Sequence, residues 1–275
     1  MTRLRVMTLN IWNGQGPWQK RLRLIRRELR QLAPDIVGLQ EVMHHPERHI
    51  DQAKEVAAGL GYHVAFGPAS TWDGMRFGNA VLSRFPIVAV NEVLLPGVST
   101  HESRALLHVA VESPWGRIPF FVTHLDWEPD HGHVRARQVA AIIDTMNALA
   151  PEDQGLFPAV LVGDFNADPD SNEMQLLGAA SGAGGPLADC FAVAGDGTAG
   201  YTYARSNRYA AQDCERNQRI DYIFSRPDPA RRGAALVARL VCTTPNGGVF
   251  PSDHYGVYAE LRAVLDGPSQ VRARR

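Results

Sequence analysis

Residues 159–170 read AVLVGDFNADPD, an apolar run that gives way to alternating carboxylates and an amide. The apolar run is typical of a buried strand, and because alternate residues of an extended chain share a face, we expect Asp164 and Asn166 to point the same way. The spacing of the polar residues imitates a calcium-binding loop, but Pro169 and Gln175 stand where such a loop needs glycine and glutamate. The stretch therefore predicts a buried strand that ends either in turn residues or in part of a reaction site.

Ten further runs with the character of strands occur along the chain, bounded by Gly, Pro, Asp or Asn. They are RVMTLNIW, DIVGLQEV, YHVAFG, NAVLSRF, IVAVNEVLL, ALLHVAVE, IPFFVTHL, RIDYIFS, ALVARLVC and YGVYAELR. Apolar residues at three-to-four spacing predict helices over 18–32 and 132–149. Because helices separate some strands and short loops join others, we expect two stacked β-sheets with helices on their outer faces. We expect one domain over residues 1–265, followed by a flexible basic tail, 266–275.

The composition is that of an ordinary globular protein. The 275 residues carry a formal net charge of −1, and 45% of them are hydrophobic. Bulk charge therefore neither indicates nor excludes a polyanionic partner. The three cysteines are far apart, no secretory signal is evident, and no apolar run approaches the roughly 20 residues that span a bilayer. We expect a monomeric cytoplasmic protein without a transmembrane segment.

The predicted helix over 18–32 is rich in basic side chains. They are Lys20, Arg21, Arg23, Arg26, Arg27 and Arg30. These side chains could contact a phosphate backbone, but a solvated polar face opposite the apolar stripe of the helix is the simpler interpretation, and we favour it.

Polar residues stand at or near the ends of six of the apolar runs. They are Asn10, Glu41, His124, Asp164, Asn166, Asp221, Asp253 and His254. Taken singly, an Asp or Asn after a strand is more often a turn former than a ligand, and a single His is more often a satisfied surface or core group. The conjunction is harder to explain in that way, because burying several carboxylates close together is costly unless cations or protonation compensate. We therefore expect these side chains to share one cleft.

The chemistry of this set favours a hard cation. Carboxylate and amide oxygens without thiolates suit Mg²⁺, which is held by one or two carboxylates together with phosphate oxygens of the substrate. Glu41 and Asn10 fit that role, and Mn²⁺ would be able to replace Mg²⁺. A histidine beside an aspartate can act as a base or stabilise charge. These residues predict metal-assisted hydrolysis of a phosphate ester.

Eight motifs in the order TLNIWN, LQEV, GNAVLSRFPI, SRALLHVAV, VTHLDW, VGDFNADP, QRIDYIF and PSDHYGVYAEL resemble the endonuclease/exonuclease/phosphatase superfamily. This superfamily includes pancreatic deoxyribonuclease, apurinic endonucleases, inositol polyphosphate 5-phosphatases and neutral sphingomyelinases. The resemblance covers nearly the whole chain. It implies a four-layer α/β sandwich, with two packed mixed β-sheets flanked by helices, and a Mg²⁺-dependent phosphodiesterase or phosphatase.

The resemblance also implies where metal and phosphate bind. Glu41 would bind the metal, with Asn10 close to it, and Asp253 would complete the network of metal and water. His124 would contact the phosphate, and Arg104 looks like the family's supporting arginine beside the phosphate-binding cleft.

For the reaction itself, the resemblance implies that Asp164 and Asn166 position the attacking water or stabilise the transition state. Asp221 would orient His254. Either Asp164 or His254 could be the base, and the sequence is compatible with one metal ion or two.

The identity of the substrate is less clearly indicated. Trp127, in the segment after His124, could stack on a base or rest against a lipid, although a structural cap is the simpler interpretation. A net charge of −1 does not supply the basic surface of an enzyme that acts on duplex nucleic acid. We expect a small-molecule phosphate ester as the substrate, with nucleic acid and phospholipid as alternatives. A catalytically silent binding scaffold is a remote alternative, because the whole residue set is present.

Overall fold

The computed structural model describes residues 2–98, 102–151, 156–179, 181–182 and 185–264. The predicted basic tail, 266–275, lies outside the described residues. Whether residues 1–265 act as one catalytic domain stays a prediction.

The described residues form fifteen strands. These are β1 (Arg3–Asn10), β2 (Ile36–His45), β3 (Ile50–Asp51), β4 (His63–Trp72), β5 (Met75–Ser83), β6 (Ile87–Leu94), β7 (Ala105–Ser113), β8 (Gly116–His124), β9 (Val160–Asp164), β10 (Ser181–Gly182), β11 (Gly185–Pro186), β12 (Ala188–Asp189), β13 (Asp221–Ser225), β14 (Ala235–Val241) and β15 (Gly256–Arg262). The helices are α1 (Trp18–Leu32), α2 (Gln52–Ala57), α3 (Gly132–Leu149), α4 (Asn172–Ala179), α5 (Cys190–Ala194) and a short 3₁₀-helix (Ala210–Gln212). Among the residues that the structure describes, no helix is both long and apolar enough to cross a membrane.

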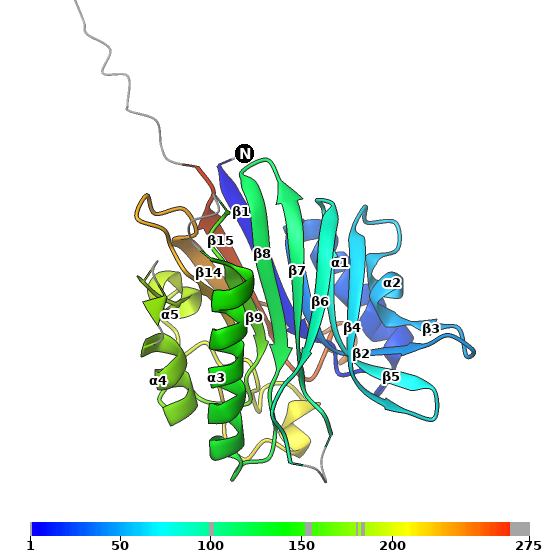
Figure 1. Ribbon diagram of the computed structural model, residues 1–275. Coiled ribbons are helices and arrows are strands. Elements are labelled where there is room, and N and C mark those ends of the chain that lie inside the picture. The colour runs from blue at the N-terminus through cyan, green and yellow to red at the C-terminus, as the bar shows by residue number, and fades with distance from the viewer. Residues whose placement is uncertain (1, 99–101, 152–155, 180, 183–184, 265–275) are drawn as a thin grey trace, which may run out of the picture.

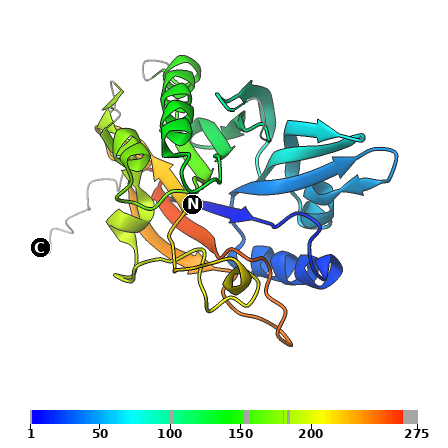
Figure 2. The same ribbon diagram turned by 90° about the horizontal axis from the view of Figure 1, so that it is seen from below.

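Two large mixed sheets pack face to face, with helices on the outer faces (Figures 1 and 2). The first sheet has the order β14-β15-β1-β2-β5-β4, with β3 beside β2, and the second has the order β12-β13-β9-β8-β7-β6. The pairs β1–β2 and β8–β9 are parallel. Every predicted strand run lies in one of these sheets, and α1 and α3 have the predicted bounds. The prediction of a four-layer α/β sandwich is confirmed.

Apolar side chains join the four layers. Val122 and Val162 belong to the core between the sheets, where a Cβ on Gly38 would lie 2.4 Å from Val162 Cγ2. Glycine therefore lets the sheets approach closely at this point. Helices α1 and α2 pack on the outer face of the first sheet, and α3 and α4 pack on that of the second. Leu29 of α1 is almost fully buried there, and burying one such side chain contributes about 1.5–3 kcal/mol.

Arg21 corrects the interpretation of α1 as a helix with a solvated basic face. Its side chain is fully buried, and its guanidinium donates hydrogen bonds to five backbone carbonyls. Those carbonyls belong to Ile11, Trp12, Asn13, Gln15 and Pro251. The favoured interpretation is wrong at this position because Arg21 lies one turn before Ile25, on the buried side of the helix. The guanidinium thus ties the loop after β1 to the segment that precedes β15.

Candidate active site

Strand β9 places Asp164 at the centre of a row of polar side chains. In the second sheet Asp164 pairs with Asp221 of β13 on one side and with His124 of β8 on the other. Gly163 makes the close approach possible, because its φ is +154° and a Cβ there would lie 2.1 Å from the carbonyl oxygen of Thr123. Three side chains that are far apart in the sequence therefore meet at one end of the sheet.

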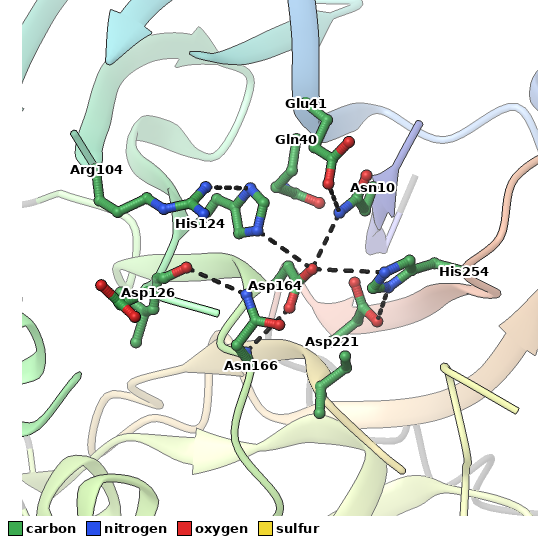
Figure 3. Close-up of polar contacts among 12 residues, drawn as sticks. Asn10, Gln40, Glu41, Arg104, His124, Asp126, Asp164, Asn166, Asp221 and His254 are labelled. Carbon is green, nitrogen blue, oxygen red and sulfur yellow. Dashed lines mark hydrogen bonds and ion pairs between the residues drawn. The ribbon is translucent and has the colours of Figure 1, made fainter. Parts of the chain in front are cut away.

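Asn10, at the end of β1, connects the first sheet to this row. Its Nδ2 donates to Glu41 Oε1 at 3.1 Å and to Asp164 Oδ2 at 3.0 Å (Figure 3). Its Oδ1 accepts from the backbone N–H of Trp12 at 2.9 Å, which fixes the orientation of the amide. The other oxygen of Glu41 accepts from Asn13 Nδ2 at 2.9 Å. Both carboxylate oxygens of Glu41 are therefore oriented by amides.

Several non-glycine residues of the site have a left-handed backbone. Glu41 has a φ of +57° at an irregularity in the register of β2 and β5, and Asn13 and Asn166 have φ values of +35° and +50°. This conformation costs about 1–2 kcal/mol for a residue such as glutamate and less for asparagine, whose short polar side chain tolerates it. Such strain persists where the surrounding contacts enforce it, and it is typical of functional sites.

His124 is buried beside the guanidinium of Arg104, which donates from Nη1 to His124 Nδ1 at 3.1 Å. Because arginine can only donate, Nδ1 is the acceptor and the proton of the neutral ring lies on Nε2. Burial lowers the pKa of His124 well below its usual value, and the positive charges of Arg104 and His254 lower this pKa further. Nε2 lies 3.6 Å from Asp164 Oδ2, so this neutral imidazole presents a donor to the centre of the site.

His254 has the opposite character. Its Nδ1 lies 2.9 Å from Asp221 Oδ2, its Nε2 lies 3.7 Å from Asp164 Oδ2, and its ring contacts that of Tyr203. Burial alone would lower the pKa of His254, but Asp221, Asp164 and Asp253 together raise it well above its usual value. The ring is therefore an imidazolium held among carboxylates.

The pKa values of two carboxyl groups around His254 are shifted as well. Burial, reinforced by Asp221, raises the pKa of Asp164 to about 7, although His254, Asn10 and Asn166 oppose the shift. Burial raises the pKa of Asp253 to about 6, against the opposing effect of His254. A carboxyl group with a pKa near neutrality can both take up and release a proton at physiological pH.

Two sets of side chains could hold a divalent cation. The ligand atoms of Asp164, Asp221 and His254 lie within 4.8 Å of one another, and they are the one such group found among the described residues. Binding there would require His254 to lose the proton on Nε2, since an imidazolium cannot be a ligand, while Nδ1–H could still donate to Asp221. Glu41 instead offers a half-buried carboxylate, and carboxylate oxygen is a ligand that fits a hard cation.

A cleft of about 670 Å³ opens beside part of this network. Glu41, Arg104 and His124 line it, and so does the exposed side chain of Trp127. The structure thus brings Asn10, Glu41, Arg104, His124, Asp164, Asn166, Asp221, Asp253 and His254 into one region, with Trp127 in the adjoining cleft.

Three contributors were not predicted from the sequence. Asn13, which orients Glu41, lies in the motif TLNIWN, so its position beside Asn10 was the available signal. Tyr203 packs on His254, and Thr202 accepts hydrogen bonds from the backbone N–H groups of Ile220 and Asp221. The stretch YTYAR that contains them has no strand or helix periodicity that would mark it.

Residues 7–254 match the Endonuclease/Exonuclease/phosphatase family, so the chain belongs to this family. The prediction of the family from the eight motifs is confirmed. Membership places the chain in a class of phosphate-ester hydrolases, which is the class that the sequence predicted.

Similar proteins include curated relatives and solved structures. The chain is 30% identical to the uncharacterized protein YbhP of Escherichia coli K12, over 59% of this chain and 66% of YbhP. It is 29% identical to a probable RNA exonuclease of Schizosaccharomyces pombe, over 56% of this chain and 32% of that protein. A crystal structure of D. rerio TDP2 complexed with single-strand DNA product superposes with a TM-score of 0.76 at 20% identity, over 95% of this chain and 99% of that one. The chain thus spans about a third of the exonuclease's length, and the likeness to TDP2 shows the fold.

Proposed function

We propose that this protein is a divalent-metal-dependent phosphodiesterase that acts on a small phosphate diester. The observation that carries the proposal is the position of Asp164, whose carboxylate is joined to Asn10 and lies between the Nε2 atoms of a neutral His124 and a cationic His254. A base, a neutral donor and a cation around one point are the groups that attack of water on phosphorus requires.

Asp164 is the proposed base. Its pKa of about 7 allows it to accept a proton from water as the new oxygen–phosphorus bond forms and the bond to the leaving oxygen breaks. Asn166 donates its backbone N–H to Asp164 Oδ1 at 3.0 Å and thereby leaves Oδ2 facing the histidines. His254 would stabilise the negative charge that develops on the phosphorus oxygens, and Asp221 keeps it protonated and in place.

His124 and Arg104 are the proposed phosphate-binding pair. Arg104 fixes the tautomer of His124, so that His124 Nε2–H can donate to a phosphate oxygen. Among the described residues that line the cleft, Arg104 is the one cation, and it stands with Glu41 and Glu102. This balance suits the single negative charge of a diester better than the double charge of a monoester.

Glu41 would hold the divalent cation, with Asn10 and Asp253 close to it. When bound, Mg²⁺ or Mn²⁺ supplies positive charge for the leaving oxygen. Asn10 and Asn13 orient the two oxygens of Glu41 before any ion arrives. We further propose that the protein acts as a monomer of one catalytic domain in the cytoplasm, where its three buried free cysteines would stay reduced.

A panel of phosphate esters tests the proposal. After removal of metal by a chelator, Mg²⁺ or Mn²⁺ should restore hydrolysis of bis(p-nitrophenyl) phosphate but give little hydrolysis of p-nitrophenyl phosphate. Glu41→Gln should lower turnover by a factor on the order of 10² or more and raise the Mg²⁺ concentration needed for half-maximal activity. Glu47→Gln, at an exposed site in the turn after β2, is the matched control and should behave as wild type.

Two results would count against the scheme. Activity that persists in excess chelator would show that the reaction needs no metal. Near-wild-type turnover of a folded Glu41→Gln protein would show that Glu41 is not the metal ligand. If no ester in a panel that also includes sphingomyelin and inositol phosphates is hydrolysed, a binding scaffold becomes the better interpretation.

Nucleolytic trimming of a single-stranded end is the second candidate function. Two of the similar proteins named above, a probable RNA exonuclease and a protein crystallised with single-strand DNA product, favour it. Shortening of a labelled oligonucleotide at a rate comparable with that of a small diester would support this candidate over the first.

A further inference from the structure

Two tryptophans at the cleft have no part in the chemistry proposed above. Trp72 ends β4 and is 51% exposed, and Trp127 follows β8 and is 57% exposed. A tryptophan can bury about 150–250 Å² of surface, and each Å² of apolar surface left in water forgoes about 25 cal/mol. Both side chains therefore forgo a large part of their hydrophobic stabilisation.

Both tryptophans line the same cleft as His124 and Arg104, one from the β4–β5 hairpin and the other from the segment after β8. Phe77 lies beneath Trp72, with ring centroids 5.8 Å apart, so Trp72 rests on a fixed base. Apolar walls with a few polar groups between them are the usual construction of a small-molecule site.

The segment that carries Trp127 is held rigidly by buried groups of α3. Gln138 Oε1 accepts from the backbone N–H of Asp126 at 3.0 Å, and Arg135 Nη1 donates to the carbonyl of Glu128 at 2.7 Å. Trp127 is therefore flanked by two anchored residues while its own ring stays exposed. Because the backbone around Trp127 is already fixed, little conformational entropy is lost when a ligand packs on its ring.

The charge of the cleft indicates what the two rings contact. Glu41 and Glu102 stand with Arg104 along its walls, so no continuous basic track is present for a long phosphate backbone among the described residues that line it. A ligand that suits the cleft has one phosphate near Arg104 and His124 and an uncharged flat group for the tryptophans.

We propose that Trp72 and Trp127 form the specificity subsite of the enzyme and that they bind the planar heteroaromatic ring of a nucleoside esterified to the reacting phosphate. Stacking on tryptophan accepts any flat ring, so the subsite selects nucleoside esters over alkyl esters without selecting strongly among bases. This inference rests on the proposed phosphodiesterase function and adds the class of the group that the diester carries.

A pair of diesters with the same leaving group tests the subsite. Thymidine 5′-(p-nitrophenyl phosphate) and methyl p-nitrophenyl phosphate both release p-nitrophenol, so the ratio of their kcat/KM values reports only on the nucleoside. Wild type should prefer the thymidine ester by tenfold or more, and Trp72→Leu and Trp127→Leu should each lower that preference by about tenfold. The loss of kcat/KM for the methyl ester should be much smaller than the loss for the thymidine ester, because a methyl group cannot stack on either ring.

Three controls make the result specific. Trp127→Phe keeps a flat ring and should retain part of the preference, whereas Trp115→Phe, at a site packed on Phe85, should leave it unchanged. Circular dichroism checks that each variant is folded. An unchanged preference in both leucine variants, or an equal loss for both substrates, would overturn the proposal.

Binding separates this inference from the proposed function. Calorimetric titration with thymidine 5′-phosphate and with methyl phosphate needs no turnover. Wild type should bind the thymidine compound more tightly than methyl phosphate, and this difference should weaken in Trp72→Leu and Trp127→Leu. That result supports the subsite even if no diester is hydrolysed. Absence of hydrolysis would contradict the proposed function but not the subsite. Equal affinity of wild type for both compounds overturns the subsite even if hydrolysis is rapid.

Discussion

His254 at the polar end of the sandwich and His108 in the middle of β7 are both buried, and the ring of each contacts an aromatic ring. The ring nitrogen Nδ1 of each has one close side-chain partner, Asp221 at 2.9 Å for His254 and Asn91 at 3.0 Å for His108. Carboxylates raise the pKa of His254 well above its usual value, whereas burial lowers the pKa of His108 to about 4. The same residue type at similar burial is thus a cation in one place and neutral in the other.

The difference lies in the hydrogen-bond partner. The amide nitrogen of Asn91 donates to a neutral imidazole, whereas the carboxylate of Asp221 stabilises a charged one. Under the proposed function, this difference separates a side chain that would serve the reaction from one that serves the fold. Changes at His254 should therefore affect activity, and changes at His108 should affect stability.

The largest effect is expected from His254→Ala. Loss of the imidazolium should lower kcat/KM for bis(p-nitrophenyl) phosphate by a factor on the order of 10² or more, because the developing charge on phosphorus loses a fixed cation. The measurement is hydrolysis at saturating Mg²⁺, beside the urea midpoint of unfolding. A loss smaller than tenfold in a folded variant would show that the comparison assigns His254 the wrong role.

Asp221→Asn should have the next largest effect. Asp221 is the carboxylate that raises the pKa of His254 most, so its loss should lower that pKa. Because the protonated ring is the active form, activity should fall by about tenfold or more, and the alkaline limb of the pH–rate profile should move to lower pH. An alkaline limb at an unchanged position would mean that His254 does not titrate in it.

His108→Phe should change stability rather than activity. The folded-state pKa of about 4 lies below the ordinary value of 6.5, so the unfolded chain takes up a proton first as the pH falls. The contribution of neutral His108 is fully present above pH 6.5 and is lost towards pH 4, at up to about 1.4 kcal/mol per pH unit. Urea unfolding at pH 7 and pH 5 is the measurement. Between these pH values the free energy of unfolding should fall less in His108→Phe than in wild type. Reduced turnover at pH 7.5 would contradict the assignment of His108 to the fold.

The smallest effect is expected from Tyr203→Leu. The aromatic ring that contacts His254 is lost, and contacts of this kind contribute about 0.5–1.5 kcal/mol, so kcat should fall by less than about tenfold. Tyr203→Phe keeps the ring and should retain wild-type kcat. Equal loss in both variants would assign the effect to the hydroxyl group instead of the ring.

The fold was largely predictable from local patterns. A run such as ALLHVAVE carries its own strand signal, and the apolar stripe of 18–32 has the length that makes helical periodicity visible. Helices α2 and α5, with six and five residues, are too short to show a period, and their formation depends on tertiary packing.

The grouping of the candidate site was predictable where a polar side chain ends a strand, as at His124 and Asp164. Side chains whose function depends on distant partners were not predictable. Arg21 reaches the carbonyl of Pro251, and Trp72 meets Trp127 only across the cleft. The sequence records the type of these residues, but the partners that define their function are known only once the chain has folded.

The position of β15 between β14 and β1 bears on when activity can arise. Arg3 pairs with Arg262 and Thr8 with Val257, so the first sheet gains this inner strand only once the chain has been made as far as Arg262. His254 and Asp253 enter the site with that late segment. A polypeptide that stops before this segment would therefore lack part of the candidate site, and folding that depends on such distant pairing should be slow compared with that of a helical protein.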